Sequence, residues 1–255
     1  MGIVIDLNCD MGESYGVWER GQDAELAPWV TSANVACGFH AGDPLNLYRT
    51  ILLCRQERVS VGAHVSYPDR VGFGRRHLRC TEEEIYTDTL YQLGALGGIC
   101  RALGMGLSHL KPHGALYHDA LVHEEVATAL VRAARSYDPD LFIYAPPGSL
   151  LAQVAEEMGI RVAAEAFLDR AYRPDGTLVP RSEPGALITD PGEVARRAVR
   201  LATEGTVAAV DGSLLRLSPR TLCIHSDTPG APALARAAAE ALIAAGVDLA
   251  PPWWR

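Results

Sequence analysis

The 255-residue chain contains almost no lysine. Its 23 basic residues comprise one lysine, Lys111, and 22 arginines. A phosphate-binding loop of the GxxxxGK[ST] type needs a lysine followed by serine or threonine, whereas Lys111 is followed by Pro112. Schiff-base chemistry would also have to use Lys111. An arginine-rich genome explains the count equally well, so only the position of the remaining lysine indicates function.

Long apolar runs are missing as well. Charged residues interrupt the apolar stretches near 93–107 and 231–249, so no membrane span is predicted. The first ten residues, MGIVIDLNCD, lack the basic region of a signal peptide. We therefore expect a cytoplasmic protein without membrane contact.

Positive charge is also in deficit. Acidic residues outnumber basic ones by 31 to 23, which gives a formal charge of −8 and argues against nucleic acid as a partner. The six cysteines include no CxxC pair, so neither a structural zinc site nor a thioredoxin-type motif is predicted. Small buried thiols are expected instead.

Short β-rich runs alternate with helical patterns along the whole chain, which we interpret as one domain spanning residues 1–255. Strands are predicted near 3–8, 32–37, 59–64, 107–111, 141–145, 161–167 and 221–225. Helices are predicted near 23–29, 44–58, 82–103, 118–136, 149–158, 191–204 and 229–245. This alternation favours a parallel sheet closed or nearly closed into a barrel, and a doubly wound open sheet is the alternative.

Several helix starts are marked by capping residues. Asp43 and Asp190 each precede a proline at the first helical position, and Thr228 does so with a hydroxyl group. Thr81 and Glu84 have the spacing of a capping box.

Titratable and amide side chains recur where each predicted strand ends. In a parallel α/β sheet these ends form the ligand-binding face, so we expect the side chains to meet in one cup. Single members have simpler explanations: Asp43 as a helix cap, His109 as a satisfied core histidine, and Asp69 with Arg70 as a surface ion pair. The set comprises Asp6, Asn8, Asp10, Glu13, Asn34, His40, Asp43, His64, Asp69, Arg70, His109, Lys111, His113, Glu165, Asp169, Arg170, His225 and Asp227.

Two common catalytic motifs are absent from the sequence: there is no GxGxxG after the first predicted strand and no HExxH. Carboxylate, histidine and lysine chemistry therefore remains. Three or four of His40, His64, His113, His225 and Asp10 are suitable ligands for a divalent metal. Their spacing carries no helical metal signature, so the sequence leaves the presence of a metal open.

Six segments together resemble the LamB/YcsF family, in the same order and over essentially the whole chain. They are DLNCDMGES at 6–14, NVACGFHAGDP at 34–44, GAHVSYPD with GFGRR at 62–76, HLKPHGALY at 109–117, EAFLDRAY at 165–172 and LVPRSEPGA at 178–186. The chain departs from the family pattern at Val65, where proline is expected, and at Ser226, where glycine is expected.

The resemblance implies a seven-stranded parallel (β/α)7 barrel related to the glycoside hydrolase and deacetylase barrels. It also implies the A subunit of a prokaryotic 5-oxoprolinase, which opens the lactam of 5-oxo-L-proline to L-glutamate with hydrolysis of ATP to ADP and phosphate. The B and C subunits are the implied partners, and ATP with Mg²⁺ is the implied cofactor. Whether phosphoryl transfer takes place on this chain stays open, although the missing nucleotide loop favours ring hydrolysis here.

If the chain has this activity, the residues of the cup are expected to serve either catalysis or substrate binding. Asp10 or Glu13 is expected to act as general base, His64 or His113 as proton donor, and Lys111 as an electrostatic stabiliser of phosphate or oxyanion. Arg70 or Arg170 is expected to bind the substrate carboxylate. The further predicted substrate-binding residues are Asp6, Asn8, Asn34, His40, Glu165 and His225.

Two other functions remain open: a self-sufficient metal-dependent hydrolase or deacetylase on the same barrel, and a non-catalytic subunit that presents substrate. The C-terminal segment 251–255, PPWWR, is either a docking tail or a segment packed against the barrel's own helices.

Overall fold

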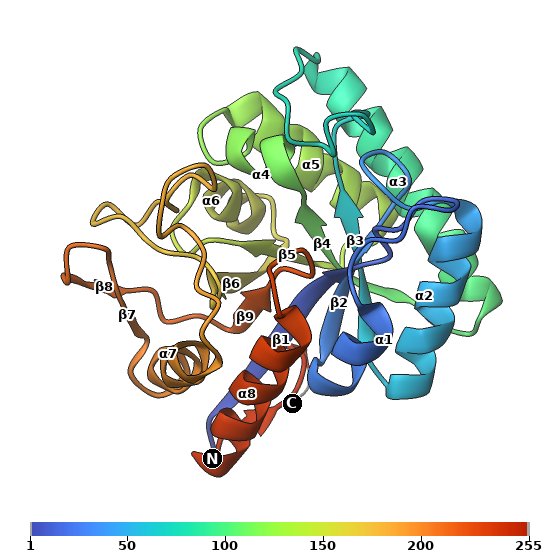
Figure 1. Cartoon of the computed structure of the whole chain (residues 1–255). Helices are drawn as coiled ribbons and strands as arrows, with labels where there is room; N and C mark the ends of the chain where they lie inside the picture. The colour runs from blue at the N-terminus through green and yellow to red at the C-terminus, as the bar shows by residue number, and fades with distance from the viewer. Residues whose placement is uncertain (1, 254–255) are drawn as a thin grey trace.

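The computed structural model describes residues 2–253 and contains a closed barrel of seven parallel strands. The strand order is β1-β2-β3-β4-β5-β6-β9, and pairing of β1 with β9 closes the ring (Figure 1). This confirms the predicted barrel and excludes the open sheet. The strands are β1 (Val4–Met11), β2 (Ser32–Ala36), β3 (Ser60–Val65), β4 (Leu107–Pro112), β5 (Phe142–Ala145), β6 (Arg161–Phe167) and β9 (Thr221–Ile224).

Helices cover the outside of this ring (Figure 1). They are α1 (Asp23–Leu26), η1 (Ala27–Trp29), α2 (Pro44–Glu57), α3 (Glu82–Ala102), α4 (Gly114–Asp119), α5 (Glu124–Tyr137), α6 (Leu150–Glu157), α7 (Pro191–Glu204) and α8 (Ala231–Ala244). Asp43 and Asp190 cap α2 and α7 as predicted, and Thr81 with Glu84 forms the capping box of α3.

Two local predictions were wrong. The helix expected over 118–136 is two helices, α4 and α5, separated by a turn in which the His123 amide donates to the Asp119 carbonyl at 2.8 Å. The Thr228 hydroxyl does not cap α8 but donates to Asp169, and Gly230 is the N-cap residue at φ +76°.

The hairpin of β7 (Thr206–Ala208) and β8 (Leu214–Arg216) and the short β10 (Asp248–Leu249) beside β1 were missed. Asp211-Gly212 between two apolar runs is a hairpin signal that identifies the first of these.

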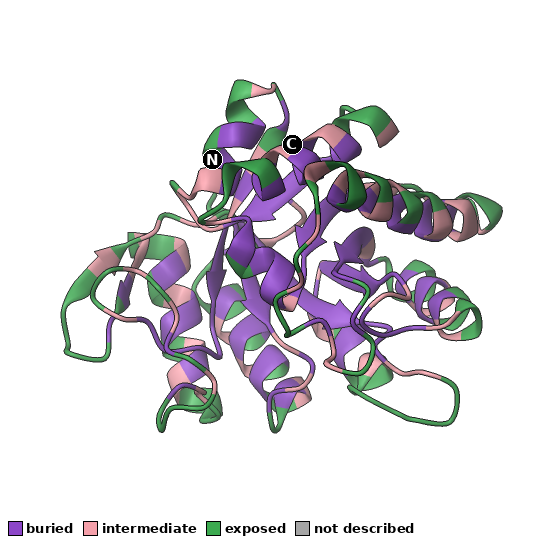
Figure 2. Ribbon diagram, turned by 90° about the horizontal axis from the view of Figure 1, so that it is seen from above, coloured by how far each residue is buried: buried purple, intermediate pink, exposed green. Residues whose placement is uncertain are grey.

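The apolar core lies between the barrel and its helices rather than inside the barrel. Residues such as Leu7, Val35, Leu96 and Leu130 are fully buried there. Figure 2 shows the buried strands at the centre of the molecule and the exposed residues on the outer helix faces. Five of the six cysteines are buried and all six are free, as expected.

The inside of the barrel is filled by polar side chains. The first layer centres on Asp6, which accepts hydrogen bonds from Thr31, Ser32, Tyr144 and Thr221. Burial raises the pKa of Asp6, and these hydrogen bonds offset part of that rise. The polar groups in this layer of the barrel interior therefore form hydrogen bonds with one another.

The second layer is an amide chain. Asn34 Nδ2 donates to Asn8 Oδ1 at 2.7 Å and to Asp10 Oδ1 at 3.0 Å. His109 Nε2 lies 2.8 Å from Asn34 Oδ1 and its ring stacks on Tyr144, so His109 is a satisfied core histidine.

Among residues 2–253, no helix is long and apolar enough to cross a membrane.

We expect Gly62→Ala to destabilise this interior. A Cβ at Gly62 would lie well inside van der Waals contact with the His109 ring, and overpacking of this kind costs about 1–3 kcal/mol or more. Chemical denaturation measures the change in the free energy of unfolding. Gly94→Ala in α3 is the matched control, because an added Cβ there meets nothing within 4 Å and alanine favours the helix. A Gly62→Ala protein of wild-type stability would contradict this packing.

Candidate active site

A pocket of about 550 Å³ opens at the carboxyl ends of the strands, as predicted for the cup. Of the predicted site residues, Asp10, His64, Lys111, His113, Arg170 and His225 line it. A larger hollow of about 880 Å³ lies beside α7, and none of the predicted site residues lines it. Of these two pockets, only the one at the strand ends is lined by predicted site residues.

Lys111 lies at the floor of this pocket and is almost fully buried. Its Nζ atom is 2.7 Å from Glu165 Oε1, 3.0 Å from Cys223 Sγ and 3.6 Å from Asp10 Oδ1. Burial lowers the pKa of Lys111, but Asp10, Cys223 and Glu165 outweigh it and hold that pKa well above its ordinary value. The buried carboxylates therefore favour the ammonium form, which is the form that cannot attack a carbonyl in Schiff-base chemistry.

Asp10 carries the matching negative charge. Burial raises the pKa of Asp10, but His64 and Lys111 more than compensate and hold that pKa well below its usual range. Its Oδ1 atom is 3.4 Å from His64 Nε2. An ionised carboxylate therefore faces the pocket next to the ammonium group.

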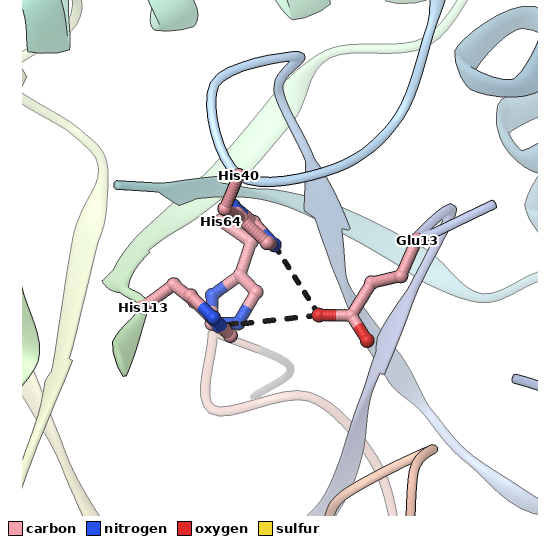
Figure 3. Close-up of side chains that lie close together, drawn as sticks. All are labelled: Glu13, His40, His64 and His113. Carbon is pink, nitrogen blue, oxygen red and sulfur yellow. Dashed lines mark hydrogen bonds and ion pairs between the residues drawn. The ribbon is translucent and has the colours of Figure 1, made fainter. Parts of the chain in front are cut away.

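Three imidazoles and one carboxylate gather beside Asp10. His40, His64, His113 and Glu13 each contribute one donor atom, and the four atoms lie within 4.8 Å of one another (Figure 3). The rings of His40 and His113 stack at 3.8 Å between centroids. The four residues come from the loops or ends that follow β1, β2, β3 and β4.

This cluster is deeply buried, and burial dominates its electrostatics. It lowers the pKa values of His40 and His113 well below the usual range for histidine, so neutral rings are favoured. Burial next to Asp10 raises the pKa of Glu13 to about 7. Ser226 Oγ donates to Glu13 Oε2 at 3.3 Å, so the departure from glycine at this position adds a contact to the cluster.

Beside this cluster, an aspartate–histidine pair follows β6 and β9. Asp169 accepts hydrogen bonds from the backbone amide of His225 at 3.1 Å and from its Nδ1 at 3.0 Å. Burial raises the pKa of Asp169, but the adjacent His225 and the hydrogen bonds outweigh it and lower that pKa below the ordinary value. A carboxylate on Nδ1 leaves the Nε2 of His225 free to exchange a proton with a ligand.

Asp169 was not among the predicted catalytic or binding residues. The signal available in the sequence was its position two residues after the end of a predicted strand. Asp69 was interpreted as a partner of Arg70, but it pairs with Arg76 instead. Arg70 donates to the Tyr15 hydroxyl at 2.7 Å and to the Gly38 carbonyl at 3.0 Å, and it does not line the pocket.

Arginines surround the mouth of the pocket, and most of them are paired. Arg75 and Arg181 contact Asp227 at 2.5 and 3.1 Å, and Arg173 contacts Glu183 at 2.8 Å. Arg170 is nearly buried and donates to the Val179 carbonyl at 2.6 Å.

Within residues 2–253, no carboxylate oxygen lies within ion-pair distance of the Arg170 guanidinium, which lines the pocket. Burial lowers the pKa of Arg170, and the neighbouring Arg181 and Arg75 lower it further, but the group remains a cation.

Some predicted binding residues lie deeper than expected. Asp6, Asn8 and Asn34 are fully buried in the barrel interior, and none of them lines the pocket. Glu165 is also buried, and it contacts the pocket residue Lys111 through an ion pair. Their hydrogen bonds hold the floor of the site in place.

The C-terminal segment is only partly described. Trp253 packs against Phe142, Tyr144 and Ala163, where it closes the barrel end opposite the pocket. Trp253 is therefore packed on the barrel, but against strands β5 and β6 rather than against helices as expected. Trp254 and Arg255 lie outside the described residues.

We expect Lys111→Met to lower the free energy of unfolding by about 3–5 kcal/mol, because it leaves two buried carboxylates without their cation. Equilibrium denaturation measures this loss. Adding Glu165→Gln to the same chain should restore part of it, because one of the unpaired charges disappears. Arg196→Met removes an exposed ion pair with Glu193 and serves as control, with an expected loss below about 1 kcal/mol. Equal losses in Lys111→Met and Arg196→Met would contradict the buried pairing.

Comparisons with known proteins agree over nearly the full length. The model of the LamB/YcsF family matches residues 5–253. The chain is 49% identical to the 5-oxoprolinase A subunit of Symbiobacterium thermophilum over 248 residues, covering 97% of this chain and 95% of that protein. It is also 49% identical to the 5-oxoprolinase A subunit of Thermus thermophilus over 245 residues, covering 96% of this chain and 98% of that protein.

A solved structure is equally similar. The crystal structure of the lactam utilization protein from Thermus thermophilus superposes with a TM-score of 0.92 at 48% identity. The match covers 96% of this chain and 98% of that one. The family model, the relatives and this structure together establish that the chain belongs to the LamB/YcsF family.

Proposed function

We propose that the chain is the A subunit of an ATP-dependent 5-oxoprolinase that acts in the cytoplasm together with B and C subunits. The substrate is 5-oxo-L-proline, and the products are L-glutamate, ADP and phosphate. The observation that carries the proposal is a pocket with an unpaired guanidinium group, Arg170, on the same side of the molecule as an ammonium group and an Asp–His pair. These groups match a small lactam that bears one carboxylate, and relatives at 49% identity are named as the A subunit of 5-oxoprolinase.

The chemistry of a lactam explains the need for ATP. An amide in an unstrained five-membered ring is resonance-stabilised, so its hydrolysis by water has little driving force. Transfer of the γ-phosphoryl group to the amide oxygen converts that oxygen into a leaving group. One water then adds to the activated carbon and the carbon–nitrogen bond breaks, which gives an acyl phosphate of glutamate. A second water releases inorganic phosphate.

Lys111 and Arg170 supply the positive charge that this sequence of steps needs. Arg170 binds the substrate carboxylate, because its guanidinium is the pocket cation without a protein carboxylate among the described residues. Lys111 Nζ, fixed by Glu165, faces the amide oxygen or the phosphoryl group attached to it. Because buried partners already hold Lys111 in position, its side chain does not have to move when negative charge develops on the substrate oxygen.

The Asp169–His225 pair supplies the proton for the leaving nitrogen. Asp169 holds the ring through Nδ1, so Nε2 is the atom that delivers the proton. This assignment replaces His64 and His113 as proton donors, because both of those rings face each other at 3.0 Å in the buried cluster. Asp10 lines the pocket beside His64 and is assigned as the general base for water on its position.

Release of glutamate from 5-oxoproline, measured with and without ATP, tests the whole proposal. We expect no turnover by the chain alone and ATP-dependent turnover after the B and C subunits are added. ATP-independent deacetylation by the chain alone would favour the metal-dependent hydrolase instead. Full activity of a complex that contains both Asp10→Asn and Lys111→Ala would favour a subunit that only presents substrate.

We expect Asp169→Asn to lower kcat of the complex by about 100-fold or more, because an amide no longer fixes the tautomer of His225. KM for 5-oxoproline should change little, since Asp169 contacts no bound carboxylate in this scheme. Steady-state glutamate release measures both constants. Asp211→Asn, in the exposed β7–β8 turn, is the matched control and should keep wild-type kinetics. An unchanged kcat in Asp169→Asn would remove His225 from the proton path.

We expect Arg170→Gln to raise KM for 5-oxoproline by about 10- to 100-fold, which corresponds to the loss of one charged hydrogen-bonded contact. Arg170→Lys should recover part of this affinity because it keeps the charge. Arg173→Gln is the control, with an effect below about threefold, because Glu183 already neutralises that guanidinium. If Arg170→Gln and Arg173→Gln raise KM equally, Arg170 is not the carboxylate site.

A further inference from the structure

The cluster of Glu13, His40, His64 and His113 contains contacts that a neutral, metal-free arrangement does not satisfy. His64 Nε2 and His113 Nδ1 are 3.0 Å apart, and His40 Nε2 is 3.2 Å from Glu13 Oε1. His113 Nδ1 is 3.9 Å from the same Glu13 oxygen (Figure 3). All four side chains are buried, so water does not reach these atoms freely.

The hydrogen atoms of the three rings are fixed by their outer nitrogens. His64 Nδ1 lies 3.1 Å from the Lys111 carbonyl and His113 Nε2 lies 2.9 Å from the Phe73 carbonyl. A carbonyl only accepts, so both of these nitrogens carry the hydrogen.

His40 is fixed in the same way through a serine. Its Nδ1 is 3.0 Å from Ser66 Oγ, and that hydroxyl already donates to the Tyr67 carbonyl at 3.0 Å. The serine oxygen therefore accepts from His40 Nδ1, and the Nε2 of His40 is left with a lone pair.

Three ring nitrogens with lone pairs and a carboxylate oxygen therefore lie within 4.8 Å of one another. A proton between His64 and His113 satisfies one contact, and a second proton between His40 and Glu13 satisfies another. A single divalent cation satisfies all four atoms at once. The buried site therefore needs positive charge at its centre, and one divalent metal ion supplies it to all four atoms.

The distances and the surroundings match a metal centre. A tetrahedral ion with bonds of about 2.0–2.1 Å has ligand atoms about 3.3 Å apart. Three of the contacts, at 3.0, 3.2 and 3.9 Å, bracket this value, and a turn of the stacked His40 and His113 rings brings the remaining atoms, now within 4.8 Å, onto the ion. Ligating histidines in proteins usually donate their second nitrogen to a carbonyl or another fixed acceptor, as all three rings do here. Three imidazoles favour zinc and its neighbours over magnesium.

We propose that Glu13, His40, His64 and His113 bind one divalent transition-metal ion, with zinc preferred. This set differs from the ligands considered from the sequence, since Glu13 takes the place of Asp10 and His225. His64 and His113 line the pocket, so the ion lies at its wall next to Asp10. The site stands apart from the proposed oxoprolinase activity, because the ligands all belong to this chain and binding is measured without turnover.

Zinc titration of the metal-stripped chain, in competition with a chromophoric chelator, tests the proposal. We expect one equivalent of Zn²⁺ per chain, unaffected by millimolar Mg²⁺. Co²⁺ in place of zinc should give visible absorption bands of the intensity typical of four-coordinate sites. Both measurements use the wild-type chain and need no variant. Absence of stoichiometric Zn²⁺ binding, or a Co²⁺ spectrum of six-coordinate intensity, would overturn the site.

Variants locate the ion. Glu13→Gln and His113→Ala should each weaken Zn²⁺ binding by more than about 100-fold, and Zn²⁺ should raise Tm of the wild type but not of these variants. His123→Ala removes an exposed imidazole at the start of α5 and should bind like the wild type. Wild-type affinity in a folded Glu13→Gln or His113→Ala chain would contradict the ligand set.

The two proposals fail separately. Zinc binding without 5-oxoproline turnover by the reconstituted complex would overturn the proposed function alone. Turnover by a complex in which this chain binds no zinc would overturn the metal site alone.

Discussion

The rest of the structure depends on one constraint: charged groups enclosed in the barrel must find partners there, because water does not reach them. Lys111 is the centre of this arrangement, since its ammonium group is held by Glu165, Cys223 and Asp10. Below it, hydroxyl groups surround Asp6 and asparagines link the strands. The polar interior therefore fixes the floor of the pocket before any ligand arrives.

The side chains around the pocket above this floor form distinct clusters. One wall holds the imidazole cluster with Glu13, the adjoining wall holds the Asp169–His225 pair, and paired arginines form the mouth. Each wall is positioned by contacts to the backbone or to buried carboxylates rather than by exposed loops. Such an arrangement suits a reaction in which a small anionic substrate is held still while charge moves between oxygen and nitrogen.

Sequence patterns were reliable where a local rule determines the structure. Alternating residues such as Asp6, Asn8 and Asp10 share one strand face at any register, so their common position inside the barrel was predictable. Prediction failed where partners are distant in the sequence or where two near neighbours compete. Thr228 has the position of a helix cap but bonds Asp169, and Asp69 pairs with Arg76 rather than with the adjacent Arg70.

The sequence by itself determined the barrel, its strand-end cup, and the chemistry available there: carboxylates, imidazoles and a single lysine. Alternation and capping are short-range properties, and six matching segments carry the family. Only the tertiary structure decided which groups meet. It placed Glu13 among three histidines from other strands and left Arg170 without a carboxylate among the described residues, because barrel closure, not spacing along the chain, sets the distances between strand ends.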